Sequence, residues 1–418
     1  MSSTLASASG SSFNSGAASS IKKDGNVASF SSKATAIDTY GNTFEAPDYS
    51  IKDILRATPA HCYERRTAES LWYVFRDIAC MVFFGYVAQN YICLLPHPAL
   101  RFAAWAAYTY VQGLFGTGLW VLAHECGHGA FSDHTWVNDT VGWILHSYWF
   151  VPYFSWKFSH GKHHKATGHM DRDMVFVPHT KESFMKKHHA HSLEEIASDS
   201  PLYSLGHLLG QQLGGWIMYL FTNVTGQKVA DSAWGMNHFN PNSAIFEKRD
   251  YWYIVMSDIG VLTQALVVYT WYKHFGAFNV LMHWAIPYIY VNHWLVFITF
   301  LQHSDPKMPH YEAHQWNFAR GAAATIDREF GFVGKHIFHD IIETHVLHHY
   351  CSRIPFYNAR EASEAIKKVM GHHYQHSDES MWVSLWKSAR QCQFVEGDNG
   401  VLMYRNVNGF GVDPKKKS

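Results

Sequence analysis

The chain carries three short histidine runs, which read His124-Glu-Cys-Gly-His128, His160-Gly-Lys-His163-His164 and His345-Val-Leu-His348-His349. Histidines three or four positions apart share one face of a helix, so each run can aim its imidazoles at a single point. Imidazole is a ligand for iron, copper, zinc and nickel. Eight convergent nitrogens exceed what one tetrahedral metal needs. Because the runs lie beside long apolar segments, they predict a two-metal site at the edge of a membrane.

Four segments are long and apolar enough to cross a bilayer, which takes about 20 residues in a helix. They cover about residues 74–95, 102–123, 253–272 and 278–301. Short loops separate the first from the second and the third from the fourth, so the segments form two hairpins that each return the chain to the same side. The fold class predicted is an all-α integral membrane protein with four transmembrane helices, interfacial helices and a cytosolic helical cap that carries the three histidine runs.

The parts of the chain outside these segments suggest its organisation and location. Residues 1–45 are rich in Ser, Ala and Gly and predict a disordered cytosolic tail, residues 46–410 the membrane domain, and residues 411–418 a basic C-terminal tail. Most Lys and Arg residues lie outside the two hairpin loops, which places both termini and the metal site in the cytosol. The terminal Lys415-Lys-Lys-Ser418 resembles a retrieval signal for the endoplasmic reticulum membrane.

Composition excludes several classes of function. The 418 residues have no net formal charge and no long basic block, so the sequence predicts no binding of nucleic acid. The six cysteines form no Cys-x-x-Cys pair, which argues against a disulfide framework.

Two readings of the histidines other than a two-metal enzyme remain open at this point. The first run also matches His-Glu-x-x-His, the zinc-protease signature with Glu125 as general base, and so allows a membrane-embedded zinc hydrolase. That reading leaves the imidazoles of the other two runs without a role. A metal transporter ranks last, because its ligands belong at mid-membrane and only His283 and His293 fall inside a predicted span.

The chain resembles the membrane fatty acid desaturases over about residues 45–410. Beside the eight-histidine pattern, the resemblance rests on three stretches: Ala123-His-Glu-Cys-Gly-His-Gly-Ala-Phe-Ser132, Val151-Pro-Tyr-Phe-Ser-Trp-Lys157 and Arg172-Asp-Met-Val-Phe-Val-Pro178. A fourth, Glu343-Thr-His-Val-Leu-His-His349, contains the third run. The context is most similar to the fungal delta-12 and omega-3 acyl-lipid branch.

The resemblance implies two iron ions held almost wholly by histidine. The ligands it implies are His124, His128, His160, His163, His164, His303, His345, His348 and His349. His303 is the ninth and directly follows the fourth span. One position departs from the acyl-CoA branch, where an Asn stands one helical turn before the equivalent histidine and here Thr299 stands. That departure leaves open how the last coordination position of the second iron is filled.

The resemblance also implies the reaction. O2 and two electrons would introduce a cis double bond at delta-12 of oleoyl chains to give linoleoyl chains. The alternatives are an omega-3 desaturase acting on linoleoyl chains and, on the same scaffold, a hydroxylase or conjugase. The substrate would be a fatty acyl phospholipid, or an acyl-CoA, within the membrane lipid.

Electrons must come from another protein, because the chain carries no haem signature and no dinucleotide-binding glycine loop. The resemblance implies cytochrome b5, reduced from NADH by its reductase. Lys157, Lys162, Lys165 and Arg353 flank the runs and could meet an acidic donor. Three acidic residues near the runs, Glu125, Asp340 and Glu343, are expected to orient imidazoles.

Overall fold

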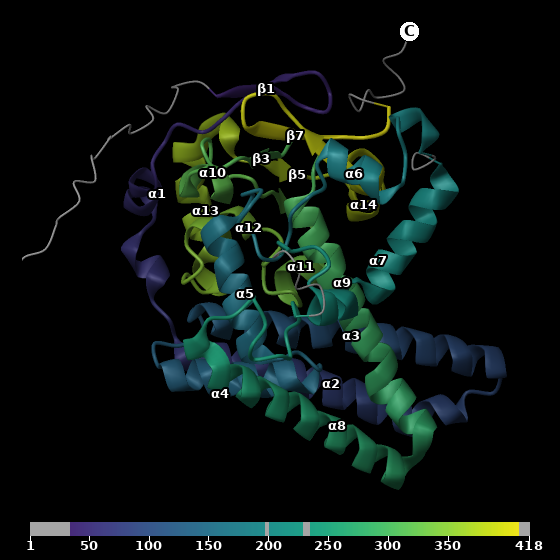
Figure 1. Ribbon diagram of the computed structural model, residues 1–418. Coiled ribbons are helices and arrows are strands. Elements are labelled where there is room, and N and C mark those ends of the chain that lie inside the picture. The colour runs from purple at the N-terminus through teal and green to yellow at the C-terminus, as the bar shows by residue number, and fades with distance from the viewer. Residues whose placement is uncertain (1–33, 197–199, 229–234, 409–418) are drawn as a thin grey trace, which may run out of the picture. The chain divides into compact units, whose positions relative to one another are not determined.

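Two helical hairpins and a cap of shorter helices make up the protein, seen in a computed structural model that describes residues 34–196, 200–228 and 235–408 (Figure 1). The structure is 63% helical. Residues 411–418 and most of the predicted N-terminal tail lie outside the described residues.

The first hairpin consists of α2 (Thr67–Tyr91), the short turn η2 (Ile92–Leu94) and α3 (Pro98–His128). Pro98 begins α3 at a position where its missing N–H is not needed. Gly129 ends α3 with a φ of 70°, a left-handed conformation that glycine adopts without strain. The chain therefore leaves the helix immediately after His128, which places the first histidine run in its last turns.

The second hairpin consists of α8 (Tyr251–Val280), the π-helical turn η5 (Leu281–Ala285) and α9 (Ile286–His303). At Gly276 the backbone turns to φ 79° and ψ 170°, and there the chain reverses, so that α9 returns toward the cap (Figure 1). Pro287 lacks the N–H that an α-helix would donate to His283, and the π-turn lies directly before it.

Within the described residues, two segments pass a length and hydropathy test for crossing a membrane, Thr67–Leu94 and Lys248–His303. The helix α3 is not among them, although it covers the second predicted span. Its buried residues begin at Tyr108 and include most positions from there to Cys126, so the second half of α3 packs among other helices. A Cβ on Gly116 would lie 2.5 Å from Trp149 and 2.8 Å from Val291, so only glycine allows this close approach.

The remaining helices lie outside the two hairpins. They are α1 (Ile51–Ala57), η1 (Ala60–Tyr63), α4 (Thr135–Tyr148), α5 (Tyr153–Ala166), α6 (Lys181–Lys187), η3 (Leu193–Glu195), α7 (Pro201–Thr222), η4 (Lys248–Asp250), α10 (Phe318–Ala322), α11 (Gly331–His336), α12 (His345–Tyr350), α13 (Phe356–Met370), η6 (Gly371–His373) and α14 (Met381–Gln391).

Small β-sheets correct the all-α prediction. The strand β7 (Val401–Arg405) pairs antiparallel with β3 (Pro309–Tyr311) and β6 (Phe394–Glu396), with His310 opposite Leu402. A parallel pair joins β4 (Asp327–Arg328) and β5 (His376–Ser377). The pairs β3–β7 and β4–β5 join segments far apart in sequence, and strands of two to five residues carry no recognisable period.

The predicted tail is wrong in its last part. β1 (Thr35–Ile37) and β2 (Thr43–Glu45) form an antiparallel hairpin, with Thr35 opposite Glu45. Ala34, buried beside these strands, packs in a cluster with Val401 and Met403 of β7. Residues 34–45 are ordered by that contact with the C-terminal part of the chain.

The glycine at position 116 gives a direct test of this packing. We expect Gly116→Ala to lower the free energy of unfolding, because overpacking costs about 1–3 kcal/mol against a helix-propensity gain of about 1 kcal/mol. The measurement is the thermal midpoint of the purified protein in detergent. Gly210→Ala on α7 is the control, since nothing lies within 4 Å of its added Cβ. Equal stability of the two variants would contradict the packing described for α3.

Candidate metal centre

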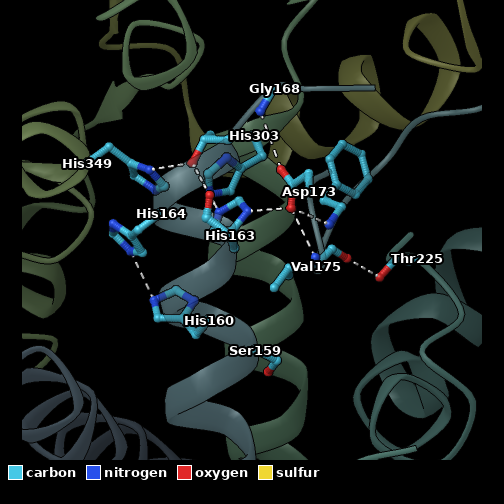
Figure 2. A network of polar contacts seen from close by, with 12 residues as sticks. Ser159, His160, His163, His164, Gly168, Asp173, Val175, Thr225, His303 and His349 are labelled. Atoms are coloured by element: carbon cyan, nitrogen blue, oxygen red, sulfur yellow. Dashed lines mark hydrogen bonds and ion pairs between the residues drawn. The ribbon is translucent and has the colours of Figure 1, made fainter. Parts of the chain in front are cut away.

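Four helices from distant parts of the chain bring the nine predicted ligands together. His124 and His128 end α3, and His160, His163 and His164 occupy the second half of α5. The third run forms most of α12, and His303 is the last residue of α9. Figure 2 shows the imidazoles of α5 facing His303 and His349. All nine predicted residues therefore lie in one region.

The first group contains five histidines. His124, His128, His160, His164 and His348 each offer a ring nitrogen, and these five atoms all lie within 4.8 Å of one another. The Nε2 atom of His160 is 3.1 Å from Nε2 of His124 and 3.1 Å from Nε2 of His164. All three histidine runs contribute to this group.

The second group lies next to the first. His163, His303 and His349 offer nitrogens within 4.8 Å of one another, and Nε2 of His345 lies 3.1 Å from Nε2 of His303. The ring of His349 stacks on that of His164 with centroids 4.2 Å apart, which makes the two groups direct neighbours. His303 thus belongs to the second group of nitrogens.

The spacing of the nitrogens fits metal ligation. With metal–nitrogen bonds of about 2.1 Å, two ligands lie about 3.0 Å apart at a right angle and about 3.4 Å apart at a tetrahedral angle. The closest pairs in the two groups are separated by 3.1 and 3.4 Å. The two groups can therefore each surround one ion.

The chemistry of the rings agrees with that geometry. The Nε2 atoms of His128, His348 and His349 are buried and without a hydrogen-bond partner among the described residues, an arrangement that is costly unless another ligand is bound. Burial holds the pKa of His160, His164 and His348 well below the usual range. The rings are therefore neutral, the state in which imidazole binds metal.

Asp173 is a supporting residue that sequence reasoning missed. The Nδ1–H of His163 donates to its Oδ1 at 2.7 Å, which leaves Nε2 of the ring for the metal (Figure 2). The backbone N–H groups of Gly168, Val175 and Phe176 also donate to this carboxylate. The sequence offered one signal, a carboxylate shortly after the second run within a stretch that carries the family resemblance.

Thr167 and Asp327 support the third run, Thr167 at a side chain and Asp327 at the backbone. The Thr167 hydroxyl donates to the His163 carbonyl at 2.8 Å and lies 3.0 Å from Nδ1 of His349. Asp327 is fully buried and accepts from the Val346 N–H at 2.7 Å, which fixes the first turn of α12. Neither residue stands near His349 in the sequence, so only the folded chain reveals them.

The acidic residues that the sequence nominated behave differently. Asp340 pairs with Arg360 at 2.6 Å, and Glu343 accepts from the Phe330 N–H at 3.1 Å, so the prediction that they orient imidazoles is wrong. Both hold the loop before the third run instead. Glu125 accepts from the Phe356 N–H at 3.2 Å, while its Oε1 lies 3.7 Å from Nδ1 of His124, beyond hydrogen-bond range.

Thr299, the position that departs from the acyl-CoA branch, uses its hydroxyl within its own helix. The hydroxyl donates to the Leu295 carbonyl at 2.8 Å. Asn292 is buried in the same helix, at 3% exposure. The Thr299 hydroxyl is therefore engaged by the backbone of its own helix.

Two neighbouring groups of histidines, held by four helices beside apolar hairpins, offer the ligands for two metal ions. Residues 103–380 match the family model described as fatty acid desaturase. The chain is 49% identical to an oleate hydroxylase, FAH12, of Claviceps purpurea, over 91% of this chain and 86% of that protein. It is 40% identical to the Delta(12) fatty acid desaturase of Mortierella alpina, over 91% and 96%. It is 41% identical to the Delta(12)-fatty-acid desaturase of Arabidopsis thaliana, over 90% and 97%. The chain belongs to the fatty acid desaturase family.

The role found for Asp173 predicts a defect in metal binding. We expect Asp173→Asn to weaken retention of one of the two metals by about 10–100-fold, because the amide no longer fixes the tautomer of His163. The measurement is metal content of the purified protein after dialysis against a graded chelator. Asp171→Asn is the matched control, since Asp171 is exposed two residues away. Equal metal retention in the two variants would refute the role given to Asp173.

Proposed function

We propose that this chain is an O2-dependent di-iron desaturase that introduces a cis double bond at delta-12 of oleoyl chains to give linoleoyl chains. The observation that carries the proposal is the pair of buried, all-imidazole groups formed by His124, His128, His160, His164 and His348 on one side and by His163, His303, His345 and His349 on the other. The Delta(12) desaturases among its relatives support the position of the double bond.

The iron ions, when bound, would supply the oxidising power by reducing O2. The reaction removes one hydrogen from each of two adjacent methylenes, and O2 takes up these two hydrogens together with two electrons and two protons to leave as two waters. The chain's own residues hold the ions with neutral rings, and Asp173 and Thr167 fix the orientation of two of them.

The electrons would come from NADH through cytochrome b5 and its reductase. Of the four cations expected near the runs, two are engaged within the protein: Lys157 pairs with Asp139 at 2.5 Å, and Lys162 donates to the Ile245 carbonyl at 2.6 Å. Lys165 and Arg353 are exposed and remain as candidates to meet an acidic donor.

We place the enzyme in the endoplasmic reticulum membrane with four transmembrane helices, and with both termini and the metal centre in the cytosol. The domain between residues 46 and 410 would act on an acyl phospholipid, with acyl-CoA as the alternative carrier. Exposed apolar side chains on both hairpins support contact with lipid, among them Phe75, Phe83, Leu262 and Leu266.

A second candidate function is favoured by one observation. The relative with 49% identity is an oleate hydroxylase. A hydroxylase would use the same nine histidines and the same first hydrogen removal, but would insert oxygen instead of removing the second hydrogen. The zinc hydrolase reading has no such support. The chain matches the fatty acid desaturase family, and a single zinc would leave the second group of imidazoles without a role.

Expression in a yeast that makes only monounsaturated lipids tests the function. We expect new 18:2 with double bonds at carbons 9 and 12, abolished in His348→Ala, because this ring belongs to the first group of ligands. The measurement is the fatty acid profile by gas chromatography. A hydroxylated 18:1 would establish the hydroxylase, and 18:3 formed only from added linoleate would establish the omega-3 enzyme. Neither product, from protein that holds one zinc and no iron, would overturn the proposal.

Glu125→Gln tests whether the Glu125 carboxylate acts as a general base. A general base contributes about 10²–10⁴-fold, so a hydrolase would lose nearly all activity. For the desaturase we expect less than about a tenfold loss, because the glutamine oxygen can still accept from the Phe356 N–H. The measurement is the rate of 18:2 formation at equal protein level. A loss as complete as that of His348→Ala would show that the carboxylate itself is required.

A further inference from the structure

A third group of potential metal ligands lies away from the centre just described. His61 and Cys62 belong to η1, which precedes the first hairpin, and Glu361 belongs to α13, which follows the third histidine run. One ligand atom from each of the three lies within 4.8 Å of the others. Nε2 of His61 is 2.9 Å from Oε1 of Glu361 and 3.7 Å from Sγ of Cys62.

We propose that His61, Cys62 and Glu361 bind a zinc ion, distinct from the two irons. Zinc bonds of about 2.3 Å to sulfur and about 2.0–2.1 Å to nitrogen and oxygen separate tetrahedral ligands by about 3.6 Å for sulfur and nitrogen and about 3.4 Å for nitrogen and oxygen. The observed sulfur–nitrogen distance of 3.7 Å is close to that value, and the 2.9 Å nitrogen–oxygen distance must widen by a few tenths of an ångström.

The ligand types point to zinc and not to iron. The set combines one imidazole, one thiol and one carboxylate, all of which zinc accepts, whereas the iron groups contain imidazole alone. Cys62 is fully buried, while the side chains of His61 and Glu361 are 57% and 61% exposed. The site is therefore closed on the sulfur side and open to solvent on the other, where a water would complete four ligands. On binding, the thiol proton passes to solvent as the zinc–sulfur bond forms.

The position of the site gives the zinc a role as a clamp. The Asn358 amide donates to the carbonyls of Cys62 and Glu64, so α13 already contacts the segment before the first hairpin. At the start of the same helix, the Phe356 N–H donates to Glu125, next to the first group of iron ligands. A zinc ion would join these two segments more firmly and hold α13 in place beside the metal centre. The clamp does not depend on which fatty acid the enzyme modifies.

Cobalt substitution provides the test, because a thiolate bound to Co²⁺ gives a charge-transfer absorption that an all-imidazole site cannot give. The sample is the full chain, purified in detergent with its iron sites loaded, and titrated with Co²⁺. We expect the absorption to saturate at one cobalt per chain, to be lost on adding Zn²⁺, and to be absent in Cys62→Ser. Cys93→Ser is the matched control, since Cys93 is an exposed cysteine outside the cluster.

A second variant keeps the test decisive if Cys62→Ser fails to fold. Glu361→Gln changes an exposed side chain, and we expect it to weaken Zn²⁺ binding at least tenfold, measured by competition with a chromophoric chelator, with an unchanged circular dichroism spectrum. No cobalt absorption at saturation, or the same absorption in Cys62→Ser, overturns the proposal. So does equal zinc affinity in Glu361→Gln and in the unmodified chain. None of these outcomes bears on the proposed desaturase, whose metal and product are measured separately.

Discussion

The structure depends on one constraint, which is that nine imidazoles must be buried together without any opposite charge in contact with most of them. Burying neutral rings with free nitrogens costs free energy in a dry interior, and bound metal ions would offset that cost. The unpaired Nε2 atoms of His128, His348 and His349 are the clearest sign of this requirement. Four helices must then bring their histidines to one place. Gly129 ends α3 directly after His128, and the reversal at Gly276 lets α9 return toward the cap.

Hydrogen bonds behind the ligands convert a cluster of rings into a defined site. The contact from His163 to Asp173 and that between His349 and Thr167 each occupy Nδ1, so that Nε2 is the nitrogen left for metal. The carboxylate of Asp173 is itself fixed by three backbone N–H groups. The backbone N–H groups therefore position the Asp173 carboxylate, and the carboxylate orients the His163 ring. These bonds fix the second run although α5 is only 14 residues long.

The sequence predicted that the three histidine runs come together and that apolar helices form two hairpins, because both follow from local patterns. Histidines at helical spacing and runs of about 20 apolar residues can be read without knowing the fold. What it missed depends on contacts between distant segments. Residues 34–45 look like a continued tail, yet Ala34 packs on Val401 of β7. Asp340 stands closer to the third run in sequence than Asp327 does, yet Asp327 supports it and Asp340 pairs with Arg360.

The chain is similar both to an oleate hydroxylase and to Delta(12) desaturases, and one set of ligands can serve either reaction. On the proposed function, the ligand set would determine which metals bind, and either reaction could begin with the same hydrogen removal. The outcome then depends on where the second hydrogen lies relative to the oxidant, a matter of the acyl chain's position and not of the ligands. Apolar walls discriminate a methylene by only about 1–3 kcal/mol. Residues that anchor the chain, rather than the nine histidines, must therefore decide between the two products.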